Sequence, residues 1–164
     1  MAAPLFSSPS SYGTSSPRPA TPSLAACSIS AYDTTFFVDH AEFARLGKDF
    51  EDRDTVVLGG STDNEHSKLG WRREHPDLDK LPIWQFADNG GKLARDLGVL
   101  DEAEGVALRA TFVVDPHNVV QHVYVTNLNV GRAPADTLRV VDALQTDELC
   151  PCNRTVGGET LKAA

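Results

Sequence analysis

Two cysteines near the C-terminus carry the clearest potential for chemistry in this sequence of 164 residues. Cys150 and Cys152 flank Pro151, and a thiolate at either position can be oxidised or can exchange with another disulfide. A Cys-x-Cys pair is also a fragment of a metal site, but zinc takes four ligands and no second Cys or His pair lies at a suitable spacing. We therefore expect thiol chemistry at this pair and no metal.

The third cysteine, Cys27, lies in a stretch rich in Ser, Ala and Pro that has no helix start behind it. Nothing in that stretch would activate its thiol, so we interpret Cys27 as an incidental exposed cysteine. An odd number of cysteines also argues against the disulfide framework of a small secreted protein. No histidines are paired at metal-site spacing, and we expect all five at the surface or in turns: His40, His66, His75, His117 and His122.

The formal net charge is -8, from 23 acidic and 15 basic residues, and the sequence contains no basic patch. A nucleic-acid partner is not expected, because binding to phosphates relies on basic side chains that release counterions. No apolar run is long enough to cross a bilayer. Residues 24–27 resemble a lipoprotein cleavage box but lack the charged start and apolar core that precede one. We expect a soluble, cytoplasmic protein with no membrane partner.

Composition divides the chain into three parts. Residues 1–32 are mostly Ser, Ala, Pro and Thr, with Arg18 as the only charge. We expect them to be disordered, because they contain too little apolar surface to fold. From Asp33 the composition becomes that of a globular protein, so we place one folded domain at 33–149. Residues 150–164 form a C-terminal tail that carries the cysteine pair.

Hydrophobic periodicity and helix-end signals predict the helices of this domain. Phe43, Leu46 and Phe50 fall on one face of a helix, and Pro76 ends a second helix at the residue before it. Pro134 suits the first turn of the last helix. The expected helices are 40–52, 64–75, 92–97 and 134–145.

Short apolar runs predict the strands. Residues 55–60 form a continuous apolar run that ends in glycines, which is typical of a strand buried on both faces. Residues 111–114 and 119–125 flank a Pro- and Asn-containing segment that suits a hairpin turn. The alternation of helices and strands predicts an α/β sandwich with a mixed sheet.

Six blocks of sequence resemble one known family. They are 50–60, 71–72, 81–82, 109–115, 130–132 and 142–153, in this order between about residues 40 and 161. Together they resemble the actinobacterial branch of the alkyl hydroperoxide reductase C (AhpC/TSA) type of 2-Cys peroxiredoxin. The last block, DALQTDELCPCN, is the most specific, because a Cys-Pro-Cys or Cys-Ala-Cys sequence after such a helix end seldom arises by chance.

The resemblance implies a thioredoxin-like (peroxiredoxin) α/β sandwich with a mixed central sheet, in which the N-terminal strands are missing from this chain. It implies a cofactor-free thiol peroxidase that reduces hydrogen peroxide and alkyl hydroperoxides in antioxidant defence and redox homeostasis. The reductant would be a dithiol protein, either thioredoxin-like or an alkylhydroperoxidase adaptor. The subunits would form homodimers or rings.

Proteins of this family use two thiols. A peroxidatic cysteine at the start of a helix attacks the peroxide as a thiolate, and a resolving cysteine then forms a disulfide with the resulting sulfenic acid. By resemblance, Cys150 matches the resolving cysteine and Cys152 is an auxiliary thiol. Arg109 matches the arginine that stabilises the thiolate and the peroxide.

The peroxidatic cysteine itself is absent from the matching region. An alignment without gaps places Phe36 at its position, and an alignment with a two-residue deletion places Asp39 there. A third alignment treats residues 35–38 as the remnant of the core strand, with the active-site loop excised. In each case we expect a peroxidase activity far below that of the family.

Two other hypotheses fit the sequence. In one, the chain is a non-catalytic regulatory or binding relative that pairs with peroxiredoxin subunits, or with a reductase, through Cys150. In the other, it is the product of a degraded gene that does not fold. The second follows from a missing central strand, which would leave hydrogen-bonding groups of the sheet unpaired.

Overall fold

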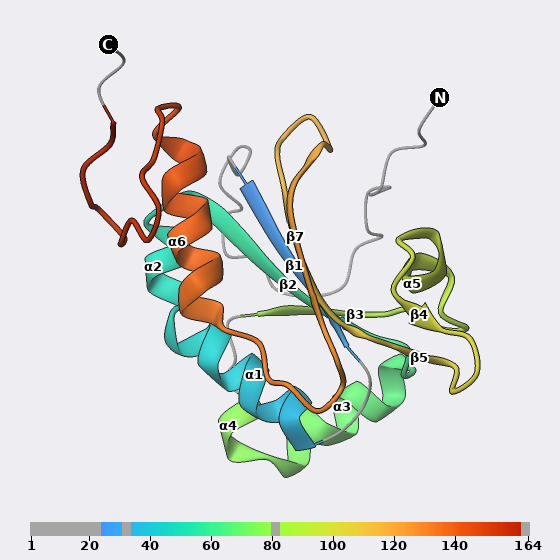
Figure 1. The fold of residues 1–164 in the computed structure, drawn as a ribbon. Coiled ribbons are helices and arrows are strands. Elements are labelled where there is room, and N and C mark those ends of the chain that lie inside the picture. The colour runs from blue at the N-terminus through green and yellow to red at the C-terminus, as the bar shows by residue number, and fades with distance from the viewer. Residues whose placement is uncertain (1–23, 31–33, 80–82, 162–164) are drawn as a thin grey trace.

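The structure, a computed structural model, describes residues 24–30, 34–79 and 83–161. Five strands form its main sheet: β1 (Leu24–Ser30), β2 (Thr55–Ser61), β3 (Trp84–Ala87), β6 (Arg109–Val114) and β7 (Val120–Thr126). Their order is β3-β2-β1-β6-β7 (Figure 1). Strands β1, β2 and β3 are parallel, whereas β6 is antiparallel to β1 and β7 is antiparallel to β6. The predicted mixed sheet is therefore confirmed.

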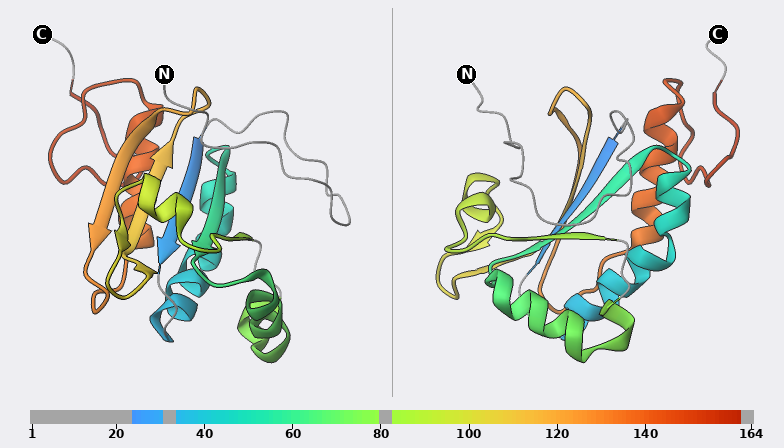
Figure 2. Two further views of the ribbon diagram at one scale, coloured as in Figure 1. Left: turned by 90° about the vertical axis from the view of Figure 1, so that its right-hand side faces the viewer. Right: turned by 180° about the vertical axis from the view of Figure 1, so that it is seen from behind.

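Six helices and a two-stranded ribbon complete the described part of the chain. The helices are α1 (Thr34–Arg45), α2 (Gly47–Glu51), α3 (Glu65–Glu74), α4 (Pro76–Asp79), α5 (Lys92–Asp96) and α6 (Pro134–Gln145). The ribbon pairs β4 (Leu100–Asp101) with β5 (Val106–Ala107). Helices α1, α2 and α6 lie together on one side of the sheet, and α5 lies with the ribbon on the other (Figure 1 and Figure 2).

A hydrophobic core fills the space on each side of the sheet. The first core lies under α1, α2 and α6 and contains Phe43, Phe50 and Val141, each at most 1% exposed. The rings of Phe43 and Phe50 lie 5.9 Å apart, so the helix face predicted from their spacing is confirmed. The second core lies on the α5 side. Strand β6 contributes to both cores, because Val113 enters the first and Phe112 the second, as alternate side chains of a strand do.

The predicted helices form, with some shifted ends. The helix expected at 40–52 begins earlier and is divided at Leu46 into α1 and α2. Helix α3 begins after Asn64, whose side chain accepts a hydrogen bond from the backbone N–H of Ser67 at 2.8 Å and caps the helix. The predicted hairpin joins β6 to β7, and Asn118 in its turn has a φ of 62°. Local signals therefore placed these elements correctly.

The N-terminal boundary of the fold differs from the prediction. Residues 24–30, expected to be disordered, form β1 at the centre of the sheet between β2 and β6 (Figure 1). The register is continuous on both sides, and Cys27 lies opposite Leu58 of β2 and opposite Phe112 of β6. A strand paired along both edges satisfies its backbone hydrogen bonds, which compensates for a sequence rich in Ser and Ala. Residues 1–23 lie outside the described residues.

The positions of α1 and β1 also correct two of the hypotheses above: that residues 35–38 are the remnant of the core strand, and that the chain lacks a central strand. Residues 35–38 are helical and belong to α1, so they are not the remnant of the core strand. The central strand is not missing, because β1 occupies that place and pairs with both neighbours. The argument that the chain cannot fold for want of this strand therefore loses its basis.

His40 is buried, and the prediction that it lies at the surface is wrong. It belongs to α1 and is only 1% exposed. The imidazole packs against Gly59 of β2, where a Cβ atom would lie 2.1 Å from His40 Nε2. Glycine at position 59 is therefore required for α1 to approach the sheet this closely.

Candidate functional site

Cys150 lies in the loop that follows α6. Thr146 ends the helix, and Asp147 turns the chain with a φ of 52°. The Sγ atom of Cys150 lies 3.6 Å from Thr146 Oγ1 and donates to the backbone oxygen of Glu148 at 3.6 Å. Cys150 is thereby half-buried against the helix end, whereas Cys152 is exposed. The pair thus presents one sheltered and one open thiol.

Asp142 fastens this cysteine loop to α6, beside which the loop runs in Figure 1. Its Oδ2 accepts hydrogen bonds from Arg154 Nη1 at 2.6 Å and from the backbone N–H of Gly157 at 3.0 Å. Its Oδ1 accepts a hydrogen bond from Arg53 Nε at 3.0 Å. The Arg154 side chain is only 4% exposed, so its ion pair with Asp142 is shielded from water. One carboxylate therefore joins α6, the loop before β2 and the C-terminal segment.

A short antiparallel bridge closes the same loop at its base. The backbone N–H of Leu161 donates to the backbone oxygen of Leu149 at 2.7 Å. The hydroxyl of Thr160 donates to the carboxylate of Glu148 close by. The cysteine pair is therefore held in a loop that is tied at both ends.

Asp142→Asn is expected to loosen this loop and to destabilise the fold by about 1–3 kcal/mol. Burial raises the pKa of Asp142, but the hydrogen bonds from Gly157, Arg154 and Arg53 outweigh it, and the pKa falls below its usual 3.8. A lowered folded pKa means that the carboxylate stabilises the fold above pH 3.8. That contribution is lost as the pH falls through the folded value. The substitution removes the charge at every pH.

The measurement is the rate of iodoacetamide labelling of Cys150 at pH 7, with hydrogen exchange over residues 149–161. Asp136→Asn is the matched control, because Asp136 lies on the same helix and pairs with Arg139 at the surface. We expect faster labelling and faster exchange only in the Asp142 variant. Equal rates in the two variants would show that Asp142 does not hold the loop.

Arg109 is fully buried at the start of β6. Its Nε donates a hydrogen bond to the backbone oxygen of Leu128 at 2.5 Å. Arg132 is also buried, and its Nη1 donates to the backbone oxygen of Ala110 at 3.4 Å. Two guanidinium groups therefore concentrate positive charge at this end of β6. Arg132 was not among the predicted site residues, and its signal in the sequence is its place in the block 130–132 that resembles the family.

Arg109 and Cys150 lie toward opposite ends of the sheet within one chain. Arg109 is the first residue of β6. At the other end of this strand, Asp115 lines the same pocket as Gln145, the last residue of α6. A strand of 6 residues spans about 20 Å. The cysteine loop follows Gln145, so the structure does not bring the two predicted site residues together in this chain.

The start of α1 contains no cysteine. Its first residues are Thr34, Thr35 and Phe36, so the alignment without gaps puts a phenylalanine in the first turn of the helix. Asp39 of the second alignment lies one turn further on. The backbone of Cys27 lies in the middle of β1 and not at a helix N-terminus, where a thiolate is favoured.

In residues 24–30, 34–79 and 83–161, no group of three or more His, Cys, Asp or Glu side chains is arranged to hold a metal ion. Over the same ranges, no helix has both the length and the apolar character to cross a bilayer.

The fold and the site together define a class of protein. The mixed sheet, with α1 and α6 on one face and a cysteine pair after α6, is that of a thioredoxin-like protein of the peroxiredoxin type. The sequence profile of the AhpC/TSA family matches residues 29–123. The chain belongs to this family, which confirms the resemblance found in its motifs.

Relatives and solved structures agree with this assignment. Over 123 residues the chain is 52% identical to alkyl hydroperoxide reductase C of Mycolicibacterium smegmatis and 48% identical to that of Mycobacterium tuberculosis. Each alignment covers 75% of this chain and 63% of the relative, so the chain spans less than two thirds of their length. The structure of Mycobacterium tuberculosis AhpC matches with a TM-score of 0.68 at 41% identity, over 79% of this chain and 74% of that one. The reduced 2-Cys peroxiredoxin of Plasmodium vivax matches with a TM-score of 0.72 at 26% identity, over 85% and 78%.

Proposed function

We propose that this chain takes part in the thiol-dependent reduction of hydrogen peroxide and alkyl hydroperoxides in the cytoplasm, as a subunit of a peroxiredoxin. The observation that carries the proposal is the placement of Cys150, a half-buried thiol in a loop that Asp142 ties to α6. Family membership and the names of the relatives support it. The reaction needs no cofactor, because a sulfur atom accepts the peroxide oxygen.

In this proposal Cys150 is the resolving thiol. A sulfenic acid on a peroxidatic cysteine condenses with the Cys150 thiol, which gives a disulfide and water. A dithiol protein, thioredoxin-like or an alkylhydroperoxidase adaptor, then reduces the disulfide by exchange, and Cys152 is the auxiliary thiol for that step. Arg109 is the cation at the peroxide site. Because Arg109 and Cys150 lie toward opposite ends of one sheet, the disulfide joins two subunits of a homodimer or ring.

The peroxidatic thiol is the part that α1 of this chain does not supply. Removing the nucleophile from a covalent catalyst lowers its rate by a factor on the order of 10³ or more. Turnover by the purified chain alone is therefore expected to be slower than that of an intact relative by at least this factor.

The test measures peroxide loss in the presence of a dithiol such as dithiothreitol, with the purified full chain. The parent is compared with Cys27→Ser, with Cys150→Ser and with the double variant. We expect slow consumption in the parent that falls to the background rate in the double variant. Turnover that survives both substitutions, and that also survives the further change Cys152→Ser, would overturn the thiol mechanism as a whole.

A second candidate is a non-catalytic binding or regulatory subunit. The first turn of α1 favours it, because Thr34, Thr35 and Phe36 cannot form a sulfenic acid. Such a subunit would enter peroxiredoxin assemblies or dock a reductase through Cys150. It would capture a partner thiol without consuming peroxide, which separates the two candidates.

A further inference from the structure

The turn between β3 and α5 has the sequence Asn89-Gly90 at its tip, and both residues are exposed. Asp88, only 7% exposed, holds the base of the turn. Its backbone oxygen accepts a hydrogen bond from the N–H of Gly91 at 2.8 Å, and its carboxylate accepts two more, at 2.9 and 2.8 Å, from backbone N–H groups in the first turn of α5. The base of the turn is therefore fixed, whereas its tip is open to water.

An asparagine that precedes a glycine is chemically labile. The backbone nitrogen of the glycine loses its proton and attacks the side-chain carbonyl carbon of the asparagine. A C–N bond forms, the C–NH2 bond breaks, and ammonia leaves behind a cyclic succinimide. Water then opens the ring at one of its two carbonyl groups, which gives aspartate or isoaspartate. The whole reaction consumes one water and releases one ammonia, and it needs no oxidant, reductant or enzyme.

Gly90 offers little hindrance to this attack. A Cβ atom at this position would meet nothing within 4 Å, so no neighbouring group packs against it from that side. Its φ of 80° is a conformation that glycine adopts readily and that other residues disfavour. Because glycine has no side chain, its nitrogen is also more accessible than that of any other residue.

The remaining asparagines provide a comparison within the same chain. Asn118 and Asn153 are also exposed and have φ angles of 62° and 58°, so exposure and a left-handed backbone do not by themselves distinguish Asn89. They are followed by Val119 and Arg154, whose side chains hinder the approach of the backbone nitrogen. None of the other five asparagines precedes a glycine: Asn64, Asn118, Asn127, Asn129 and Asn153.

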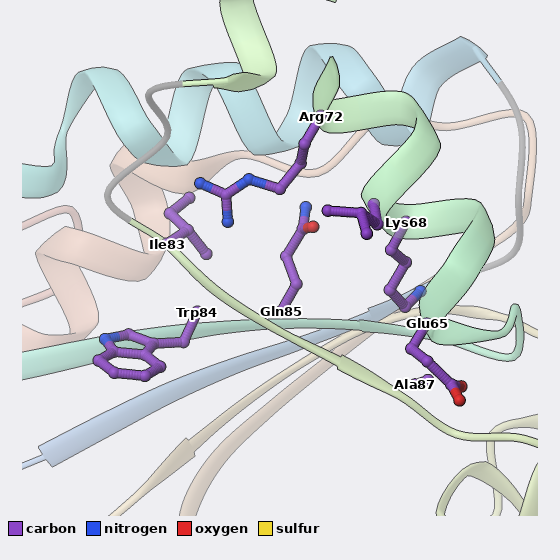
Figure 3. A pocket seen from close by; sticks show the side chains of 8 residues that line it. Glu65, Lys68, Arg72, Ile83, Trp84, Gln85 and Ala87 are labelled. Carbon is purple, nitrogen blue, oxygen red and sulfur yellow. The ribbon is translucent and has the colours of Figure 1, made fainter. Parts of the chain in front are cut away.

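Glu65, the first residue of α3, holds the amide of Asn89. Asn89 Nδ2 donates a hydrogen bond to Glu65 Oε2 at 3.1 Å. Figure 3 shows the Glu65 carboxylate near the end of β3, where Ala87 lines the same cavity between α3 and β3. Hydrogen bonds from its own backbone N–H and from Asn89 lower the pKa of Glu65, so its carboxylate is charged at neutral pH. His66 Nε2 lies 3.8 Å from the other oxygen of this carboxylate.

The charges around the turn disfavour ring closure. Negative charge develops on the attacked amide, and the carboxylates of Glu65 and Asp88 both lie at this turn. The two cations of α5 already have acidic partners, Lys92 with Asp96 and Arg95 with Glu102. Glu65 therefore restrains the reaction in two ways, because it fixes the amide by a hydrogen bond and its charge opposes the attack.

We propose that Asn89 is a site of spontaneous deamidation and that Glu65 restrains its rate. The product is aspartate or isoaspartate, so a carboxylate faces Glu65 where an amide donated a hydrogen bond. Like charges this close repel each other, and the link between the turn and the start of α3 is lost. Isoaspartate also adds one methylene group to the backbone of the turn. The modification therefore marks the age of a protein molecule, and it is independent of peroxide reduction.

The test incubates the purified full chain at neutral pH over several weeks and follows each asparagine by peptide mass spectrometry. Isoaspartate is detected with a protein L-isoaspartyl methyltransferase, which methylates this product and not aspartate. We expect Asn89 to convert before any other asparagine. Asn89→Gln is the control for the site, because a glutamine would have to form a larger ring, and we expect it to lose the isoaspartate signal.

Glu65→Ala is expected to speed the conversion of Asn89 about fivefold, since it removes one hydrogen bond and one charge. Glu65→Gln keeps an acceptor without the charge, and its rate is expected to lie between those of the parent and the alanine variant. Glu74→Ala is the matched control, because Glu74 is exposed at the other end of the same helix. Circular dichroism checks that all variants fold like the parent. Hydrogen exchange over residues 63–68 and 88–94 is expected to quicken after deamidation.

Two results would overturn the proposal. Asn89 is not the labile site if it stays intact while another asparagine converts, or if no asparagine converts during the incubation. Equal rates of Asn89 conversion in Glu65→Ala and Glu74→Ala would show that Glu65 does not restrain the reaction.

Discussion

Phe36→Cys is expected to raise peroxide consumption by the purified chain about tenfold or more. Position 36 lies in the first turn of α1, where the backbone N–H groups and the helix dipole favour a thiolate. Lowering the pKa of a thiol by about one unit near neutral pH multiplies its thiolate fraction by almost ten. The measurement is the initial rate of peroxide loss at pH 7 with excess dithiothreitol.

Asp39→Cys is the matched comparison. Position 39 lies on the same helix, and it is the cysteine position in the alignment that allows a two-residue deletion. Asp39 lies one turn further into α1, and the effect of a helix N-terminus falls off within the first turn. We therefore expect a smaller gain than at position 36. If neither variant exceeds the parent, the surroundings of α1 no longer support attack on peroxide, and the non-catalytic candidate is favoured.

Cys152→Ser is expected to trap Cys150 in a stable mixed disulfide with a dithiol partner. The probe is a thioredoxin with a single active-site cysteine, activated with thionitrobenzoate. Attack by the Cys150 thiolate releases thionitrobenzoate and leaves the two proteins joined. In the parent, Cys152 is close in sequence and can attack the new bond, so the adduct is expected to be short-lived. Released thionitrobenzoate is followed by absorbance, and the adduct by non-reducing electrophoresis.

The controls for this trap separate the three thiols. Cys27→Ser with Cys152→Ser should trap as well as Cys152→Ser alone, whereas Cys150→Ser with Cys152→Ser should lose nearly all of the adduct. Trapping that persists without Cys150 would assign the reactive thiol to Cys27 and would remove Cys150 from its resolving role. Mass spectrometry of the peptide that carries the disulfide identifies the sulfur directly.

Elements with strong local signals were predictable from the sequence, and β1 was not. The cap at Asn64 and the proline at the start of α6 act within one turn of the chain, so α3 and α6 could be placed from neighbouring residues. Strand β1 is built from Ser, Ala, Cys, Leu and Ile, and its stability comes from pairing with β2 and β6. That pairing joins distant residues, so composition alone favoured disorder.

The candidate site, like the fold, could be predicted from the sequence only where its signal was local. The motif at 142–153 located the cysteine pair, but it did not show how the loop is held. Asp142 binds Arg53, which lies 89 residues earlier, and such an ion pair leaves no periodic pattern in the sequence. The burial of His40 against Gly59 is a contact of the same long-range kind. In both cases the missing information was which remote residues meet.

Strand β1 acquires its second neighbour late in synthesis. Its register places Ala26 opposite Val113, 87 residues further along the chain, so a ribosome must translate most of the protein before β6 can join. Pairings over such separations slow folding, since a long loop has to close before the contacts form. A nascent chain that pauses before Arg109 therefore presents an open strand edge, and it is at this stage that a chaperone would be needed.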